Sequence, residues 1–398
     1  MDYFKESLNL HRELKGKIEM VNKMPLETKE DLSLAYSPGV AAPCEHIAAH
    51  PESVWELTLK SNTVAIVSDG SAVLGLGNIG AEAAIPVMEG KAMLFKRFAG
   101  INGVPICLDT QNVDEIVATV KRIAPVFGGI NLEDISAPRS FEIEQRLQDI
   151  GIPVFHDDQH GTAIVVLAAL INASKLLGKS LLQLRVVVNG AGAAGVAIAK
   201  LLKCLDNSDS DRCMAVKEVI MCDSKGIIHS GRQNLNPAKK ELLSFTNSKD
   251  LSGSLLDALH GADVFIGVSK GDLLQAEDIH RMAPNPIIFG LANPIPEIMP
   301  EEAYAGGAAV VGTGRSDLPN QVNNVLGFPG IFRGALDARA SRISPDMKLA
   351  AAWAIAESVE QISREQVIPS TLDEAVSQRV AKAVYEVALQ ERNASQAV

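Results

Sequence analysis

Short apolar runs alternate with longer amphipathic stretches along most of this 398-residue chain. The runs are rich in Val, Ile, Leu and Ala without polar alternation, which is typical of parallel strands covered by helices on both faces of a sheet. We therefore predict strands over these ranges: 63–67, 104–108, 127–131, 152–155, 184–189, 217–222, 263–267, 286–291 and 308–311.

Helical periodicity fills the intervals between the strands and returns at both ends of the chain. The expected helical ranges are 81–98, 112–124, 140–149, 161–177 and 329–392, after a helix, a loop and a helix in the first 60 residues. Strand–helix alternation is typical of α/β proteins with parallel sheets. The expected fold class is α/β with two domains, an N-terminal α/β domain over 1–160 and a Rossmann-type doubly wound parallel sheet with C-terminal helices over 161–398.

Composition narrows the classes of partner. Hydrophobic residues make up 47% of the chain, charged residues 21%, and the net charge is -11. Such a chain lacks the broad basic surface that nucleic acid requires. Without a long apolar run or an apolar signal segment, we expect no membrane partner and a cytoplasmic location. Five cysteines with no CxxC pair favour reduced thiols.

Two pairs of acids follow predicted strands of the first domain. Glu133 and Asp134 follow one strand, and Asp157 and Asp158 follow the next. The carboxyl ends of parallel strands meet at one edge of a sheet, and carboxylate oxygens suit Mg²⁺ or Mn²⁺. Helix capping would explain one or two of these acids, but hardly both pairs. Glu133, Asp134 and Asp158 are therefore the candidate metal ligands.

Two histidines in the same stretch suggest a different metal. His156 and His160 have the spacing of a helical zinc pair. However, the zinc-protease pattern requires Glu after the first His, and Asp157 stands there. We expect the histidines to orient the acids or to cap the helix.

A glycine-rich turn follows the predicted strand at 184–189. Residues 190–195 read Gly-Ala-Gly-Ala-Ala-Gly, which fits G-x-G-x-x-G between a Val-rich strand and an Ala-rich helix. Such glycines bring backbone N–H groups to a pyrophosphate at a helix N-terminus. The residues of this turn expected to bind a dinucleotide are Gly190, Gly192, Ala193, Ala194 and Gly195.

The next predicted strand ends at Asp223, where an acid typically bonds a ribose hydroxyl. Its distance from Gly190 exceeds the usual ~20 residues, and a polar surface loop at 206–212 accounts for the excess. The acid favours NAD. Because Lys225 and Arg232 follow and would meet a 2′-phosphate, NADP remains an alternative.

Tyr36 and Lys91 stand out by their settings. Tyr36 lies beside Pro38 and Gly39 in a predicted loop, and Lys91 interrupts an apolar helical stretch. A lysine that faces a semi-buried cleft can act as a base through a lowered pKa. Taken singly, each residue fits a surface position equally well.

Several longer motifs together resemble those of the malic enzymes, in their short bacterial-type form. They occur in order along nearly the whole chain: YSPGVA at 36–41, LGLGNIG at 74–80, PVMEGK at 86–91, HDDQHGT at 156–162, LANP at 291–294 and NNVLGFPG at 323–330.

The resemblance implies a role for each site residue. Tyr36 would be the general acid, Lys91 a substrate-binding general base, and Asp157 the residue that tunes Lys91. The metal would be held by Glu133, Asp134 and Asp158. The residues expected at the substrate or the nicotinamide end of the cofactor are Asn293, Asn323 and Asn324.

The chain departs from the family pattern at one point. Larger relatives carry an arginine just before the LGLG run that clamps the substrate carboxylate, whereas this chain has Ser71 and Ala72 in that stretch. We expect Ser71 or the amide side chains to meet the carboxylate instead.

The resemblance implies oxidative decarboxylation of (S)-malate to pyruvate and CO₂ with reduction of NAD(P). Malolactic conversion of malate to lactate is one alternative. An amino-acid dehydrogenase would not need the three-acid set, and a non-catalytic nucleotide-binding regulator would be expected to lose Lys91 or the acids, all of which this chain retains.

The N-terminal segment suggests a homodimer. Its apolar stripe comprises Leu8, Leu14, Ile18 and Val21. We expect this stripe to pack on a neighbouring subunit, although packing on its own domain would also bury it.

Overall fold

The computed structural model describes residues 3–73, 75–205, 207, 212–233 and 235–396. The first sheet is wholly parallel, in the order β2-β1-β3-β4. Its strands are β1 (Thr63–Ser68), β2 (Asn102–Cys107), β3 (Gly129–Leu132) and β4 (Val154–His156). Each lies within a few residues of its predicted range.

The second sheet has the order β10-β9-β8-β5-β6-β7. Its strands are β5 (Arg185–Asn189), β6 (Glu218–Asp223), β7 (Gly226–Ile227), β8 (Val264–Gly267), β9 (Ile287–Gly290) and β10 (Val310–Thr313). Counted from β5, this is the 3-2-1-4-5-6 order of a Rossmann sheet. The predicted fold class is confirmed. The short β7, antiparallel to β6, was not predicted because a two-residue hairpin strand has no periodic pattern.

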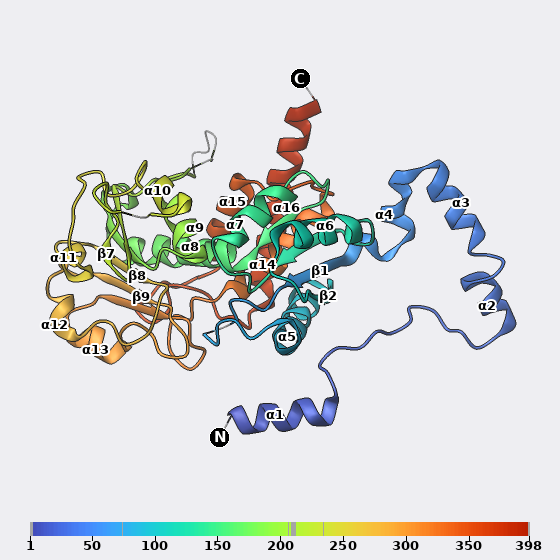
Figure 1. Ribbon diagram of the computed structural model, residues 1–398, viewed down its shortest axis with the longest axis horizontal. Coiled ribbons are helices and arrows are strands. Elements are labelled where there is room, and N and C mark those ends of the chain that lie inside the picture. The colour runs from blue at the N-terminus through green and yellow to red at the C-terminus, as the bar shows by residue number, and fades with distance from the viewer. Residues whose placement is uncertain (1–2, 74, 206, 208–211, 234, 397–398) are drawn as a thin grey trace.

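Helices cover both sheets (Figure 1). Those of the first sheet are α5 (Ala81–Ala99), α6 (Val113–Ile123) and α7 (Arg139–Leu147), and those of the second are α9 (Ala193–Leu202), α10 (Pro237–Leu242), α11 (Leu255–Leu259), α12 (Ala276–Ile279) and α13 (Pro300–Ala305). The buried helix α8 (Asp157–Leu176) joins the two. It begins four residues before the predicted start, so both aspartates lie in its first turn.

The C-terminal segment is not one continuous helical stretch. It forms α14 (Phe328–Asp337), α15 (Pro345–Glu357) and α16 (Glu374–Gln396), with non-helical chain between them. Ser344 begins α15 with a capping box, and Pro345 occupies its first turn. Such start signals interrupt a helical pattern that otherwise reads as continuous.

An aromatic cluster packs the C-terminal helices against the first sheet. The ring of Phe332 on α14 lies edge-on to Phe95 at 5.4 Å and to Phe155 at 6.0 Å between centroids. Phe328 lies 4.8 Å from Phe95. Because this core continues into the second sheet, the C-terminal helices serve both parts of the chain. The division at residue 160 stays a prediction.

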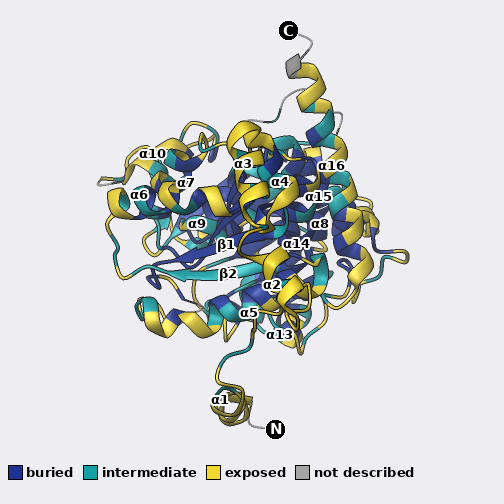
Figure 2. Ribbon diagram, turned by 90° about the vertical axis from the view of Figure 1, so that its right-hand side faces the viewer, coloured by how far each residue is buried: buried dark blue, intermediate teal, exposed yellow. Residues whose placement is uncertain are grey.

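The N-terminal residues stand apart from this body. Residues 18–50, here called the N-terminal arm, include α2 (Lys29–Ala35) and α3 (Ala41–Ala49) and contain no buried residue (Figure 2). Before the arm, α1 (Tyr3–Leu14) also buries nothing. Lys17 anchors the start of the arm to α5, where its Nζ donates to the carbonyl oxygen of Pro86 at 2.6 Å.

The expectation of reduced thiols is wrong for one pair of cysteines. Cys204 and Cys213 form a disulfide, because the chain after α9 doubles back and brings their Cα atoms to 6.0 Å. Most of the predicted surface loop at 206–212 lies outside the described residues. Within the described chain, no helix is long and apolar enough to span a membrane.

Substituting Phe332 tests the aromatic cluster. Phe332→Ala should lower the free energy of unfolding by about 3–5 kcal/mol, because it removes a fully buried ring between two others. Leu372→Ala is the control, since Leu372 is 80% exposed and its loss should cost less than about 0.5 kcal/mol. Denaturant unfolding measures both. Equal losses would contradict the role of the cluster.

Candidate active site

Carboxylates gather at the carboxyl edge of the first sheet. Asp69 follows β1, Glu133 and Asp134 follow β3, and Asp157 and Asp158 follow β4. The first four are buried, and Asp158 is partly exposed. The parallel order of the strands brings the two predicted acid pairs to one edge, where Asp69 was not predicted.

Lys91 enters this edge from α5 and is itself buried. Its Nζ lies 2.9 Å from Oε1 of Glu133 and donates a short hydrogen bond to Oδ2 of Asp157. The ammonium also lies over the ring of Phe328, 4.0 Å from the centroid. Lys91 is therefore fixed by two carboxylates and an aromatic face, with little freedom to move.

The charges of this cluster alter one another's pKa. Burial alone would lower the pKa of Lys91, but Asp157 and Glu133 outweigh it and raise that pKa. The expected lowering is therefore wrong here, because the prediction did not place two acids against the amine. Burial in turn raises the pKa of Asp157 and of Glu133, although Lys91 opposes both shifts. The raised pKa of Lys91 keeps its amine protonated as the partner of both carboxylates.

The three predicted metal ligands converge. Ligand oxygens of Glu133, Asp134 and Asp158 lie within 4.8 Å of one another. The side-chain amide of Asn131 donates to Oε2 of Glu133 at 2.7 Å, and the backbone N–H of Asp134 donates to Oδ2 of Asp158 at 2.8 Å. Such hard oxygen donors fit Mg²⁺ or Mn²⁺. Burial raises the pKa of Glu133, and the charge of Asp158 adds to the rise, so a cation between these two carboxylates would also relieve their repulsion.

The histidines do not form a zinc pair in this arrangement. His160 Nε2 bonds Glu144 of α7 at 3.0 Å, and Glu144 also accepts the backbone N–H of His156 at 3.2 Å. One buried carboxylate thereby ties α7 to both ends of the turn that carries Asp157 and Asp158. Sequence reasoning missed Glu144, because nothing near it in the chain distinguishes it from the surface acids of α7.

The predicted amide residues approach from the second domain. Asn324 Nδ2 donates to Oδ2 of Asp157 at 2.6 Å. Asn324 therefore joins Lys91, Asp157 and Glu133 in one group, here called the lysine cluster. The side-chain oxygen of Asn323 accepts the backbone N–H of Val325 and caps a short helical turn. The backbone of Asn293 approaches Gly75 so closely that a Cβ there would lie 2.8 Å from its carbonyl oxygen. Asn293 therefore lies where the two parts of the chain meet.

Ser71 and Tyr36 do not lie where the sequence analysis expected them to act. Ser71 donates to Oδ1 of Asp69 at 2.5 Å and accepts the backbone N–H of Ser136, so both roles of its hydroxyl are taken locally. Arg139, which sequence reasoning missed, donates to Oδ2 of Asp69 at 3.1 Å and is the cation beside this acid. Tyr36 lies on the N-terminal arm, 68% exposed, and no described contact brings it to Lys91.

The predicted glycine turn has the form that a dinucleotide requires. Gly190 adopts φ 126°, and a Cβ at Gly195 would lie 1.7 Å from the carbonyl oxygen of Gly190. A Cβ at Gly192 would meet nothing within 4 Å. Gly190 and Gly195 thus permit the tight turn, and Gly192 leaves its surface open. Helix α9 starts there, with Ala193 and Ala194 as its first residues.

Asp223 lies at the end of β6 beside this turn, where Gly190 N–H bonds the carbonyl oxygen of Cys222 at 2.9 Å. Its carboxylate is already surrounded by donors. Arg232 binds it through both terminal nitrogens, each at 2.9 Å, and Lys239 Nζ binds Oδ2 at 2.6 Å. Sequence reasoning did not identify Lys239, which comes from α10.

A glycine turn of this kind on a Rossmann sheet defines a dinucleotide-binding protein, here with a second domain that presents a carboxylate-rich site. Two family models match this chain and identify its family. Residues 15–148 match "Malic enzyme, N-terminal domain", and residues 159–389 match "Malic enzyme, NAD binding domain". The chain belongs to the malic enzyme family.

Individual relatives agree over nearly the full length. The chain is 56% identical to a bifunctional malic/malolactic enzyme of Bacillus subtilis, over 98% of this chain and 94% of the relative. It is 55% identical to an NAD-dependent malic enzyme of Geobacillus stearothermophilus, over 94% and 77%. The crystal structure of an NAD-dependent malic enzyme of Thermotoga maritima superposes with a TM-score of 0.90 at 51% identity, covering 95% of this chain and 98% of that one.

Replacing Glu144 tests its hold on the acid-bearing turn. Burial alone would raise the pKa of Glu144, but His160 and Lys348 lower it to about 2. Glu144→Ala should lower the free energy of unfolding by about 1–3 kcal/mol at neutral pH, because it leaves His160 and the His156 N–H without their acceptor. Glu142→Ala on the same helix, in an exposed pair with Arg146, should cost less than about 0.5 kcal/mol.

The stabilisation of the fold by Glu144 should depend on pH. A lowered folded-state pKa stabilises the fold above the ordinary glutamate value of 4.5, and this stabilisation is lost as pH falls toward 2. The difference between wild type and Glu144→Ala should therefore narrow in acid. A constant difference across that range would contradict the ionised state of Glu144.

Proposed function

We propose that this chain catalyses the oxidative decarboxylation of (S)-malate to pyruvate and CO₂, with reduction of NAD(P) and dependence on a divalent metal. One observation carries the proposal: a buried lysine bound to Asp157 and Glu133 at the edge of a three-carboxylate group. A base beside a cation site is the arrangement that oxidation and decarboxylation of a hydroxy acid require.

The lysine cluster supplies the proton transfer. To act as a base, Lys91 must first pass its own proton to Asp157, against the raised pKa of the amine. The neutral amine would then take the proton of the C2 hydroxyl, and bound NAD(P) would accept the hydride of C2. A divalent cation held by Glu133, Asp134 and Asp158 would draw electrons from the ketone, which favours loss of C4 as CO₂. Asn324 keeps Asp157 oriented throughout.

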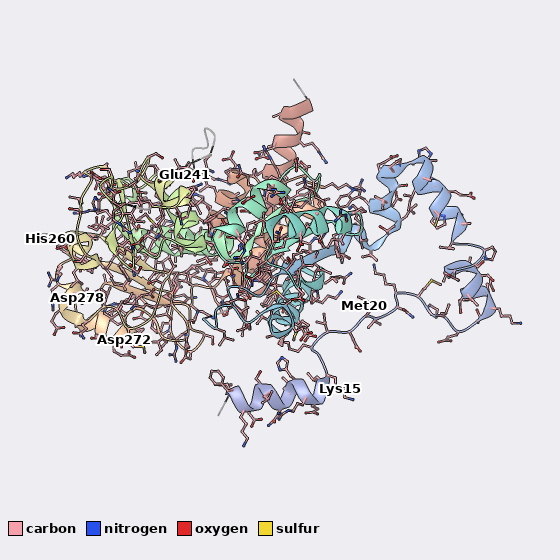
Figure 3. All side chains as sticks on the ribbon, viewed as in Figure 1. Lys15, Met20, Glu241, His260, Asp272 and Asp278 are labelled. Carbon is pink, nitrogen blue, oxygen red and sulfur yellow. A yellow bond between two sulfur atoms is a disulfide. The ribbon has the colours of Figure 1, made fainter. Side chains whose placement is uncertain are left out.

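The last proton, donated to C3 of the enolate, requires an acid, and we assign it to Tyr36 of a second subunit. The N-terminal arm extends away from both sheets, and Figure 3 shows Met20 on the link between α1 and α2. Met20 is 92% exposed and Val21 78%. Apolar side chains in water favour association with another surface. If the N-terminal arm packs on a partner subunit, it would bury Met20 and Val21 and would also place Tyr36 at the partner's site.

A homodimer is therefore the proposed assembly. The four residues of the predicted apolar stripe are all exposed within one chain, at 54% for Leu8, 53% for Leu14, 41% for Ile18 and 78% for Val21. Their packing on their own domain is thus not seen. In a twofold dimer each arm meets the other body in the same way, so both sites are completed at once.

Malolactic conversion is the second candidate, because the Bacillus subtilis relative carries that activity in its name. Both reactions begin with the same oxidation and decarboxylation. Product analysis separates them: pyruvate with accumulating NAD(P)H supports the proposed reaction, whereas lactate without net NAD(P)H supports the malolactic one.

Metal binding can be measured directly. Isothermal titration with Mn²⁺ should show binding that Asp158→Asn weakens strongly, because it removes one of three charged ligands. Asp149→Asn, at an exposed position paired with Lys121, should bind as wild type does. EDTA should abolish malate oxidation and Mn²⁺ should restore it. Full activity in chelator, together with no Mn²⁺ binding, would contradict the metal site.

A heterodimer tests whether Tyr36 acts across subunits. Tyr36→Phe and Lys91→Ala should each lower kcat by about 10²–10⁴. When the two variants are coexpressed with different tags, the purified heterodimer should recover about half of the wild-type activity, because one of its sites combines wild-type Lys91 with wild-type Tyr36.

Other outcomes of this experiment are equally informative. If Tyr36 acts within its own chain, the heterodimer stays as inactive as its parents. The heterodimer of Tyr36→Phe with Lys91→Arg provides a second pairing that preserves the buried charge. Sedimentation of a monomer at micromolar concentration would contradict the dimer itself.

A further inference from the structure

The carboxylate of Asp223 has four hydrogen-bond donors among the described residues. Oδ1 accepts the backbone N–H of Lys225 at 2.9 Å and one nitrogen of Arg232 at 2.9 Å. Oδ2 accepts the other terminal nitrogen of Arg232 at 2.9 Å and Nζ of Lys239 at 2.6 Å. The side chain of Asp223 is only 8% exposed.

These four donors occupy the hydrogen-bond acceptor sites of the Asp223 carboxylate. An ionised aspartate offers about four lone-pair sites, and each of the four donors takes one. A ribose hydroxyl would have to displace a charged donor to reach the acid. Asp223 therefore does not present the acceptor through which an acid at this position normally selects NAD.

The two cations retain unused capacity. A guanidinium has five N–H donors and an ammonium has three. One terminal nitrogen of Arg232 also donates to the carbonyl oxygens of Gly226 and Ile227, at 3.4 and 3.3 Å, which leaves donors on its other two nitrogens, and Lys239 keeps donors beyond the one given to Asp223. The side chains are 12% and 24% exposed, which leaves each with a surface for a ligand. Lys225, next to Asp223 in the chain, is exposed as well.

The local charge favours an anion. Arg232 and Lys239 carry two positive charges against the single negative charge of Asp223, although the chain as a whole has a net charge of -11. The cluster lies at the end of β6, which the glycine turn contacts through the bond from Gly190 to Cys222. A dinucleotide whose pyrophosphate lies on that turn places its adenosine ribose at this strand end.

We propose that Arg232 and Lys239 bind the 2′-phosphate of NADP, and that Asp223 positions these two cations instead of binding the ribose. The proposal rests on the proposed function for its reaction, but the recognition itself concerns only the adenosine end of the cofactor. Arginine and lysine together are well suited to a phosphate, since the guanidinium gives a two-pronged contact and the ammonium a point charge.

Binding of two nucleotide fragments tests the site apart from catalysis. 2′,5′-ADP and 5′-AMP differ only in the 2′-phosphate, and isothermal titration of the full chain measures each. Wild type should bind 2′,5′-ADP more tightly by about 10- to 100-fold, the range expected for hydrogen bonds to a charged group. Lys239→Gln and Arg232→Gln should each reduce that ratio about tenfold. Lys240→Gln, exposed on the same helix α10, is the matched control and should keep it.

Malate oxidation with NADP and with NAD gives the second readout. The ratio of kcat/KM for NADP to that for NAD should exceed one in wild type and should fall in Lys239→Gln and Arg232→Gln. Equal or weaker binding of 2′,5′-ADP than of 5′-AMP would overturn the inference even if malate is oxidised with NAD. Tight binding of 2′,5′-ADP by a chain that does not oxidise malate would sustain the inference and overturn the proposed function.

Discussion

The buried contact of Lys91 with Asp157 and Glu133 places the strictest demands on the rest of the structure. A charge taken out of water is costly unless it is paired and hydrogen-bonded, so α5, the end of β3 and the start of α8 must meet at one point. Neighbouring residues accommodate that contact. A Cβ at Gly161 would lie 1.8 Å from Oδ1 of Asp157, so only glycine fits one turn along α8. Phe328 closes the cluster from the C-terminal helices.

Much of the fold could be predicted because its signals are local. Apolar runs located nine of the ten strands that the structure describes, since a strand buried on both faces is recognisable from its own residues. The early start of α8 was harder to see, because Asp157 and Asp158 in its first turn resemble a loop. The C-terminal segment was predicted as one helical stretch for a related reason: its breaks depend on caps such as Ser344 within a pattern that stays apolar and Ala-rich.

The site was predictable where chemistry follows strand ends and hidden where it depends on distant partners. Glu133, Asp134 and Asp158 were identified from their positions after strands, and the structure brings them together. Glu144 and Lys239 have no such mark, because their importance comes from His160 and Asp223, which only the fold brings near. The raised pKa of Lys91 follows the same rule, since burial alone suggests the opposite direction.

Unbalanced charge distinguishes the two ends of the proposed site. At the first sheet, Lys91 contacts Glu133 and Asp157. Asp134 and Asp158 lie beside Glu133, so four carboxyl groups gather around one ammonium. At the second sheet, Asp223 alone faces Arg232 and Lys239, which leaves one positive charge in excess. A structure that served only stability would gain by pairing each group fully. In the proposed function a divalent cation would offset most of the acidic excess, and in the proposed cofactor recognition a phosphate would meet the basic excess. Such opposite imbalances would orient a dinucleotide, with its nicotinamide toward the carboxylates and its adenosine toward the cations.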